Sequence, residues 1–439
     1  MTSLLHAVRD HALALRGNMH DYDALLEQVG DRSLVLLGES THGTHEFYRM
    51  RAEITRRLIL EKQFDAVIVE ADWPDALRLN RYVHGRGDED IDRAFDDFQR
   101  FPRWMWRNQD VRDFIHWLAS HNDRASLNAE VGFYGLDLYS LYRSADAVME
   151  YLARVDPEQL DAAREVYTCL DHVRDPQRYG YEAVRGLRPA CSEALTHQLL
   201  SLQEVAARHV REGDLPGRDE HFFAEQNAHV VRGAEHYYRS MFSSRQSSWN
   251  VRDQHMADTV LRLQQHRRAN DGTGKLVIWA HNSHVGDARA TDMARAGEWN
   301  LGQLLRQRAA GEVMLVGFTT CTGHVAAAHD WGGEVEHFAL RTPLPDSWEA
   351  LFHQSRLESF YLPLEAPASP LDDAQRQMRA VGVIYRPASE RASHYLSSRL
   401  GAQFDAIFHL DETSALVPFD RPPHWPPFNT RAGSRGLRT

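Results

Sequence analysis

The sequence predicts an α/β fold in which a mostly parallel central sheet is flanked by helices, and a helical insertion, or cap, forms one side of a cleft. Four short apolar runs are typical of buried strands, and a long stretch with helical periodicity separates the third run from the fourth. Each run is followed at once, or after one glycine, by an ionisable residue, namely Glu39, Glu70, Asp137 and His281. The carboxyl ends of neighbouring parallel strands meet at one crevice, so we expect these side chains to converge there.

The composition is that of a globular, enzyme-sized protein. The 439 residues are 43% hydrophobic and 26% charged, which allows a large core in one or two domains. The formal net charge of -12 and the pI near 6.1 argue against nucleic acid or an anionic membrane as the main partner. Small molecules are the expected partners, and the sequence gives no indication of oligomeric state.

Cysteine usage and the amino terminus predict a cytoplasmic location. Cys169, Cys191 and Cys321 are far apart and odd in number, which favours neither a disulfide framework nor a metal clip. The first ten residues carry His6, Arg9 and Asp10 and lack the apolar core of a signal peptide. No run approaches the roughly 20 apolar residues that span a bilayer, so we expect neither export nor a membrane anchor.

Residues 1–143 are predicted to form the first half of the core. Helical spacing from Leu4 to Leu15 precedes the first strand, Leu34 to Leu37, and a further helix is expected from about Thr44 to Leu60. Arg51 lies on the apolar stripe of that helix and must find a carboxylate or a ligand, because an unpaired buried guanidinium is costly.

Aromatic and charged residues are dense between Asp72 and Trp117, before the strand at Val131. This density suits the wall of a cleft, and Trp104 and Trp106 are candidate substrate contacts there.

The remainder divides into three parts. Residues 144–265 show helical periodicity and form the predicted insertion, which the polar stretch 211–219 interrupts. Residues 266–419 form the second half of the core, with strands expected near 276–280, 313–318, 381–385 and 404–410. Residues 420–439 are rich in proline and arginine and are expected to form a docked segment and a loose tail.

Glu39 and His42 are the first candidates for chemistry. They are three residues apart just after a strand, so the carboxylate can orient the imidazole and raise its basicity. The alternative is a helix cap made by Ser40 or Thr41, with His42 merely exposed. Ser40 is also considered as a nucleophile, but His42 replaces the second glycine of the Gly-x-Ser-x-Gly turn.

His281 and His284 are three residues apart after the fourth apolar run. Both imidazoles can face the same way, where they would polarise a substrate or transfer a proton. The same spacing would hold a divalent metal together with a carboxylate such as Glu39 or Glu70, so a metal remains an alternative to a cofactor-free site.

Two more acids end strands. Glu70 is either the buried partner of Arg51 or a second acid in the site. Asp137 either belongs to the site or caps the next helix through Leu141 and Tyr142.

Several segments resemble the erythromycin esterase family. They are Gly38 to Thr44, Ile68 to Asp72, Phe133 to Asp137, Ser248 to Asp253 and Ala280 to His284, and they occur in the family's order. The resemblance implies an α/β core with a helical part and hydrolysis of a macrolide lactone by water, without a covalent serine intermediate. By motif it implies that six residues form the active site: Glu39, His42, Arg51, Glu70, His281 and His284.

We therefore predict a hydrolase that opens an ester or macrolactone with a water activated by His42. Arg252 and Asp137 join the two tryptophans as candidate substrate contacts. The first alternative is a metal-dependent hydrolase with His281, His284 and Glu39 as ligands. The second is a non-catalytic protein that binds cationic amphiphilic small molecules, which the negative net charge would favour.

Overall fold

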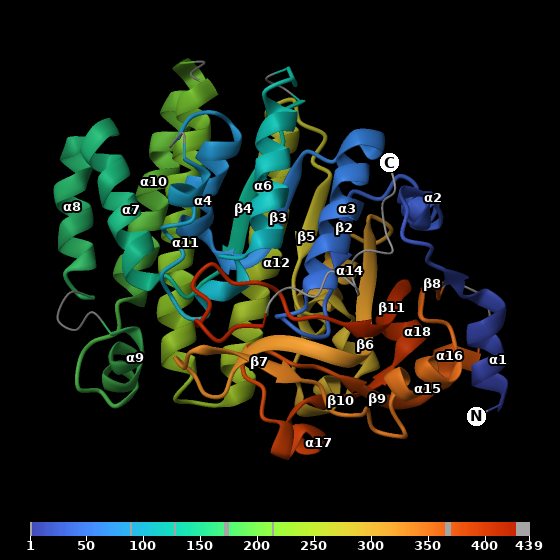
Figure 1. Cartoon of the computed structure of the whole chain (residues 1–439). Helices are drawn as coiled ribbons and strands as arrows, with labels where there is room; N and C mark the ends of the chain where they lie inside the picture. The colour runs from blue at the N-terminus through green and yellow to red at the C-terminus, as the bar shows by residue number, and fades with distance from the viewer. Residues whose placement is uncertain are drawn as a thin grey trace. The chain divides into compact units, whose positions relative to one another are not determined.

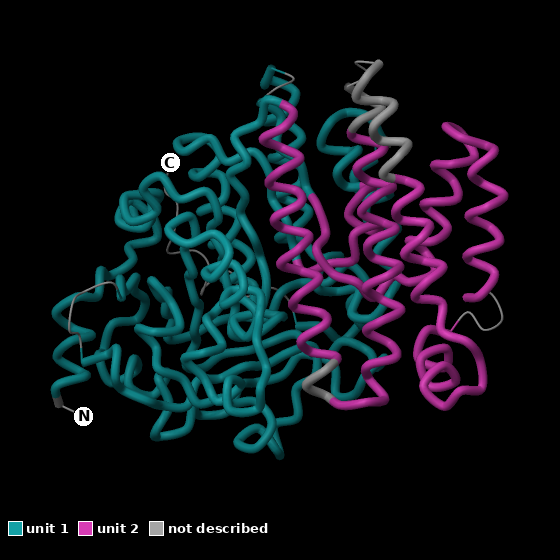
Figure 2. The backbone as a smooth tube through the Cα atoms, turned by 180° about the vertical axis from the view of Figure 1, so that it is seen from behind, with its two compact units in different colours: residues 1–69, 79–133, 271–439 teal, residues 70–78, 134–270 magenta. Residues whose placement is uncertain are grey.

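The computed structural model describes residues 2–87, 90–126, 129–170, 175–212, 215–364 and 370–426 (Figure 1). The chain divides into two compact units, which Figure 2 colours separately. The first unit contains residues 1–69, 79–133 and 271–439, and the second contains residues 70–78 and 134–270.

The fold is built on a nine-stranded sheet in the order β1-β8-β11-β6-β2-β5-β3-β4, with β7 paired to β6. The strands are β1 (Leu13–Ala14), β2 (Leu34–Leu37), β3 (Ala66–Asp72), β4 (Gly132–Asp137), β5 (Leu276–Trp279), β6 (Val313–Ala328), β7 (Val335–Ala339), β8 (Ser359–Pro363) and β11 (Ala406–Thr413). Strands β11, β6, β2, β5 and β3 are parallel, whereas β1, β7 and β8 pair antiparallel. The predicted α/β class with a mostly parallel sheet is confirmed.

Strand β2 lies between β5 and β6 in the sheet. Leu34 pairs in register with Leu276 on one side and with Val313 on the other. All residues of β2, β3 and β5 are buried, as expected for parallel strands covered on both faces. This order places the end of β2 next to the end of β5, although more than two hundred residues separate them in sequence.

The described part of the first unit also contains helices of 4 to 18 residues. They are α1 (Thr2–His11), α2 (Asp23–Val29), α3 (His45–Lys62), α5 (Ile91–Ala94), α6 (Gln109–Asn122), α13 (Asn282–Val285), α14 (Leu301–Arg308), α15 (Trp348–Gln354), α16 (Pro370–Asp373), α17 (Glu390–Ser393) and α18 (Leu400–Gln403). A hairpin of β9 (Gln375–Arg379) and β10 (Tyr395–Arg399) forms a separate two-stranded sheet. Helix α4 (Trp73–Val83) begins in the second unit and ends in the first.

The second unit is helical, as its periodicity predicted. Its helices are α7 (Leu141–Val155), α8 (Pro157–Tyr167), α9 (Pro176–Val184), α10 (Ser192–Glu212), α11 (Leu215–Ser240) and α12 (Arg245–Ala269). Helix α11 contacts α7, α9, α10 and α12, and apolar residues such as Val148, Leu199 and Val231 form its core. The predicted interruption at 211–219 is mostly helical, because residues 211–212 belong to α10 and residues 215–219 to α11; residues 213–214 lie outside the described ranges.

Three sequence expectations are wrong. Val381 to Tyr385 forms no strand, because its hydrogen bonds go to the turn at Ser40 and His42 and to Ala328 at the end of β6. The first helix ends at His11 and not near Leu15, since Leu13 and Ala14 pair with β8. The expected absence of a disulfide is also wrong.

Cys169 and Cys191 form a disulfide in the second unit, with their Cα atoms 6.0 Å apart. The cysteine count missed this pair because packing of the helical unit brings together residues that are 22 positions apart. The cysteine residues therefore no longer support the predicted cytoplasmic location.

The described helices contain none that is long and apolar enough to cross a membrane. Of the predicted carboxyl-terminal tail, residues 427–439 lie outside the described ranges.

Candidate active site

The turn after β2 is held against the turn after β5 through Asn282. The backbone N–H of Asn282 donates to the carbonyl of Glu39 (2.8 Å), and its side-chain amide donates to the carbonyl of Phe318 on β6 (2.8 Å). Gly38 permits this approach, because a Cβ at that position would lie 2.1 Å from the Oδ1 of Asn282. The clamp fixes the position of Glu39 relative to His281, which immediately precedes Asn282.

His42 and Glu39 form a buried hydrogen-bonded pair. The Nδ1 of His42 lies 2.8 Å from the Oε1 of Glu39, and the side chains are 8% and 1% exposed. An ionised carboxylate only accepts, so Nδ1–H is the donor and the neutral ring presents the lone pair of Nε2. This is the tautomer that a general base requires.

The predicted cap around this turn is wrong. Helix α3 begins at His45 with Thr44 as its N-cap residue, and Thr44 makes no side-chain capping bond. The Thr41 hydroxyl instead hydrogen-bonds to the Thr44 hydroxyl. Ser40 is fully buried, and its Oγ has no hydrogen-bond partner among the residues described. The described contacts therefore give Ser40 no base that would activate it as a nucleophile.

Arg51 ion-pairs with the second oxygen of Glu39. Its Nη2 lies 2.8 Å from Oε2, and the side chain is fully buried on α3. The guanidinium also lies over the ring of Tyr48 (4.4 Å) and near that of Trp279 (5.2 Å). The expectation that Arg51 finds a carboxylate is confirmed, and Glu39 is that carboxylate.

The Nε and Nη1 atoms of Arg51 are buried and have no hydrogen-bond partner within the described part of the chain. Arginine is always charged, so the buried positive charge of Arg51 is balanced by Glu39. Both oxygens of Glu39 are engaged, by His42 and by Arg51. A metal bound through Glu39 would therefore share these oxygens with His42 and Arg51.

His281 is the N-cap residue of α13. Its Nδ1 accepts from the backbone N–H of Ser283 (3.2 Å) and lies 2.8 Å from the Ser283 hydroxyl. Because a backbone N–H can only donate, the neutral His281 ring carries its proton on Nε2. Its centroid lies 4.9 Å from that of His42, and both residues are buried. The site thus combines an imidazole that can accept a proton with one that can donate a hydrogen bond.

His284 lies one helical turn after His281 and is also buried. Its backbone N–H donates to the carbonyl of His281. The structure therefore places His284 on the same short helix as His281, next to the clamp residue Asn282.

Glu70, Asp137 and Arg252 come together in the second unit. The Nη2 of Arg252 lies 2.7 Å from a Glu70 oxygen and 2.7 Å from Oδ2 of Asp137. Burial alone would lower the pKa of Arg252, but the charges of Asp137, Tyr139 and Glu70 outweigh it and hold that pKa well above its ordinary value. The ring of Tyr139 lies 5.0 Å from the guanidinium.

Asp137 does not cap the following helix, which contradicts that alternative. Helix α7 has Ser140 as its N-cap residue without a side-chain bond, and Asp137 instead accepts from the backbone N–H of Leu138 (2.9 Å). The carboxylate faces Arg252 because the two-oxygen contact with a guanidinium is stronger than a single capping bond.

Trp104 and Trp106, the predicted cleft-wall contacts, are 6% and 5% exposed. Trp106 packs edge-on against Tyr48, with the ring centroids 6.2 Å apart. Trp106 therefore supports the aromatic residue that lies under Arg51.

Sequence reasoning missed Tyr48 and the clamping function of Asn282. Tyr48 precedes Arg51 by three positions on α3, a spacing that puts both side chains on one helix face and was available as a signal. The clamp carried no sequence signal, since it depends on the pairing of β2 with both β5 and β6.

Comparisons with known proteins agree with this fold. Erythromycin esterase type II from Escherichia coli is 22% identical over 417 residues, which cover 90% of this chain and 93% of the relative. A solved succinoglycan biosynthesis protein matches with a TM-score of 0.75 at 22% identity, covering 95% of this chain and 98% of its own. A mutant of the erythromycin esterase EreC in its open conformation matches with a TM-score of 0.66 at 19% identity, covering 89% and 93%.

The fold and the solved matches define the chain as an α/β protein built on a mostly parallel sheet. The family model described as erythromycin esterase matches residues 59–413. The chain belongs to the erythromycin esterase family.

Proposed function

We propose that this protein opens an erythromycin-like macrolactone, or a related ester, with a water molecule that His42 activates. The observation that carries the proposal is the buried pair of His42 and Glu39, which leaves the Nε2 lone pair of His42 beside the ring of His281. Family membership supports ester or lactone hydrolysis as the reaction class.

The reaction begins with transfer of a water proton to Nε2 of His42. The hydroxide oxygen forms a bond to the acyl carbon, and the carbonyl electrons move onto the carbonyl oxygen. Glu39 stabilises the imidazolium that results, as a carboxylate does for a catalytic histidine in other hydrolases. General-base assistance of this kind contributes a factor of about 10² to 10⁴ in rate.

The oxyanion of the tetrahedral intermediate accepts a hydrogen bond from Nε2–H of His281. When the intermediate collapses, the bond to the alkoxide oxygen breaks and the proton held by His42 moves to that oxygen. The buried guanidinium of Arg51, paired with Glu39, adds positive charge to the site. Glu70 and His284 complete the proposed catalytic set by family motif, and Asp137 and Arg252 are proposed substrate contacts.

The first test is mass spectrometry of erythromycin incubated with purified wild-type protein, with His42→Ala and with Ser40→Ala. We expect the wild type and Ser40→Ala to add the mass of one water, and His42→Ala to lose turnover by about 10² to 10⁴-fold. His329→Ala, which changes an exposed histidine paired with Asp330, is the matched control and should behave as wild type.

Two outcomes would contradict the mechanism. Near-normal turnover by folded His42→Ala would remove His42 as the base, and loss of turnover in folded Ser40→Ala with an acylated wild-type protein would favour a serine nucleophile. Tight binding of erythromycin without product by the wild type would instead favour the non-catalytic binding protein. Activity that is lost on chelation and restored by a divalent metal would favour the metal-dependent alternative.

A further inference from the structure

A cluster of three potential metal ligands, with a buried histidine beside one of them, lies on β6, β11 and α15, far in sequence from the Glu39 and His42 turn. Cys321 on β6, His353 on α15 and Asp411 on β11 each offer a ligand atom, and these atoms lie within 4.8 Å of one another.

The pairing of β6 with β11 explains why Cys321 and Asp411 meet. Leu410 pairs with Thr320 and Glu412 with Thr322, so Asp411 and Cys321 lie at the same level of two parallel strands. His409 precedes Asp411 by two positions and therefore projects from the same face. Helix α15 contacts both strands and brings His353 to this face.

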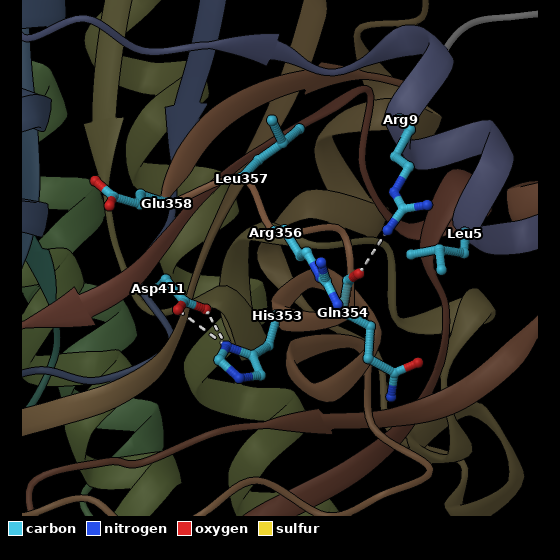
Figure 3. A pocket seen from close by; sticks show the side chains of 8 residues that line it. All are labelled: Leu5, Arg9, His353, Gln354, Arg356, Leu357, Glu358 and Asp411. Carbon is cyan, nitrogen blue, oxygen red and sulfur yellow. Dashed lines mark hydrogen bonds and ion pairs between the residues drawn. The ribbon is translucent and has the colours of Figure 1, made fainter.

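His353 and Asp411 face each other at the wall of a pocket of about 750 Å³ (Figure 3). The Nδ1 of His353 lies 2.8 Å from Oδ1 and 2.9 Å from Oδ2 of Asp411, and the histidine side chain is 60% exposed. This pair alone would be an ordinary surface ion pair. Both side chains line this pocket, so a dissolved ion can reach them from the solvent.

His409 supplies a second, independent observation. Its side chain is fully buried, and its Nε2 has no hydrogen-bond partner among the described residues, although it lies 3.7 Å from Oδ1 of Asp411. Its Nδ1 is 2.9 Å from the hydroxyl of Thr319. If Nδ1 donates to that hydroxyl, the Nε2 lone pair faces the Asp411 carboxylate, an arrangement that a cation between the two would stabilise.

The ligand atoms of Cys321, His353 and Asp411 lie within 4.8 Å of one another, so small side-chain movements would bring them to the spacing of a small tetrahedral ion. Zinc binds sulfur, nitrogen and oxygen at about 2.0 to 2.3 Å, which places tetrahedral ligand atoms roughly 3.4 to 3.8 Å from one another. The separation between His409 and Asp411 is already 3.7 Å. The exposed His353 side chain can turn from its direct contact with Asp411 to receive the ion.

The guanidinium of Arg379 donates to the backbone carbonyl of Cys321 (2.8 Å) and ion-pairs with Glu390 (2.9 Å). Two further arginines line the pocket: Arg9, which donates to the backbone carbonyls of Gln354 and Ser355, and Arg356. Cys321 is buried and is not part of the disulfide. A thiolate, two imidazoles and a carboxylate form a donor set that favours zinc over magnesium or calcium.

We propose that Cys321, His353, His409 and Asp411 bind one zinc ion that fastens α15 to the neighbouring strands β6 and β11. The site is separate from the proposed active site, and its test does not depend on hydrolysis.

The experiment measures zinc bound per chain after metal stripping, loading with excess zinc and gel filtration. We expect about one equivalent in the wild type and a clear loss of that equivalent in Cys321→Ser and Asp411→Asn. His353→Ala, which changes an exposed side chain and leaves the buried core intact, should weaken zinc binding at least about tenfold. His329→Ala, another exposed histidine beside an aspartate, is the matched control and should retain wild-type affinity.

Cobalt substitution identifies the ligands directly. The wild type loaded with cobalt should show a thiolate-to-cobalt charge-transfer band and the intense visible bands of a tetrahedral ion, and Cys321→Ser should lose the charge-transfer band. Zinc should also raise the melting temperature of the wild type but leave that of His353→Ala nearly unchanged.

The proposal is overturned if the stripped wild type takes up no stoichiometric zinc. It is equally overturned if folded Cys321→Ser and His353→Ala bind zinc as the wild type does, because the ion would then lie elsewhere. Should Cys321→Ser fail to fold, the exposed His353→Ala variant and the cobalt spectrum of the wild type still decide the question.

Discussion

At the scale of single residues, Glu39 contacts two side chains of the candidate site at once. One carboxylate oxygen holds Nδ1 of His42, and the other pairs with Nη2 of Arg51. Because all three side chains are nearly excluded from solvent, the negative charge of Glu39 balances Arg51 and also selects the His42 tautomer. Removing that charge should affect both partners.

Glu39→Gln should therefore lower kcat by about 10² to 10⁴-fold. The glutamine amide can donate to Nδ1 of His42, which would leave the proton on Nε2 and remove the basic lone pair. It also leaves the buried Arg51 without a charged partner, so the protein should be less stable. Steady-state kinetics and urea unfolding measure the two effects, and a Glu39→Gln protein with wild-type kcat would contradict this function of Glu39.

At the scale of elements, the active site depends on the close approach of two turns. Gly38 follows β2 and Asn282 begins α13, and a methyl group on Gly38 would also lie 3.1 Å from the carbonyl of Val316 on β6. Asn282 cannot move away easily, because it is hydrogen-bonded to both Glu39 and Phe318. The carbonyl of Val316 belongs to the backbone of β6.

Gly38→Ala should destabilise the protein by about 1 to 3 kcal/mol and reduce activity by separating the two turns. Gly382→Ala is the matched control, since a Cβ there would meet nothing within 4 Å. Urea unfolding of both variants checks the expectation. Equal stability of the two variants would show that the clamp between the turns tolerates extra volume.

The disulfide acts on the helical unit. It joins the segment after α8 to the segment before α10 and closes a loop of 22 positions. A loop of that size corresponds to roughly 3 kcal/mol of stabilisation, mainly through the unfolded state.

Reduction should therefore lower the melting temperature of the wild type but not that of the Cys169→Ser, Cys191→Ser double variant. Thiol titration of the denatured, unreduced wild type should find one free thiol, that of Cys321. Three reactive thiols in that titration would show that the pair is reduced in the purified protein.

At the scale of the whole molecule, stability should depend on pH through His45. Its Nδ1 lies 2.9 Å from Asp110, so the ion pair joins the start of α3 to the first turn of α6. Burial alone would lower the pKa of His45, but the hydrogen bond and charge of Asp110 outweigh it and raise that pKa above 6.5.

A raised histidine pKa in the folded state means that the stabilisation is fully present below about pH 6.5 and is lost as the pH rises through the folded-state pKa. The difference in unfolding free energy between the wild type and His45→Gln should thus be largest in mild acid and shrink above neutral pH. Each unit by which the pKa is raised corresponds to about 1.4 kcal/mol. A difference that stays constant from mild acid to mild alkali would contradict this assignment, and exposed His329→Gln is the control.

Much of the first unit could be predicted from the sequence. Strands β2, β3 and β5 are short runs of mostly apolar residues because parallel strands are buried on both faces. Such runs can be recognised in the sequence. Their polar carboxyl ends indicated Glu39 and His281 before any contact was known. Strands β7, β9 and β10 were missed, since their partly exposed residues carry no continuous apolar run. Strands β1 and β8 were missed as well, because β1 has only two residues and the buried run of β8 has only three.

Local periodicity in the sequence predicts the α/β class, the helical stretch and the ends of the buried strands. Which groups pair with one another follows only from the folded chain. Glu39 meets both His42 and Arg51, Arg252 meets Asp137, and Cys169 meets Cys191 because strand order and helix packing join distant segments. A local sequence pattern shows which face of a helix or strand is buried. Which residues contact each other depends on distant segments that meet only when the whole chain has folded.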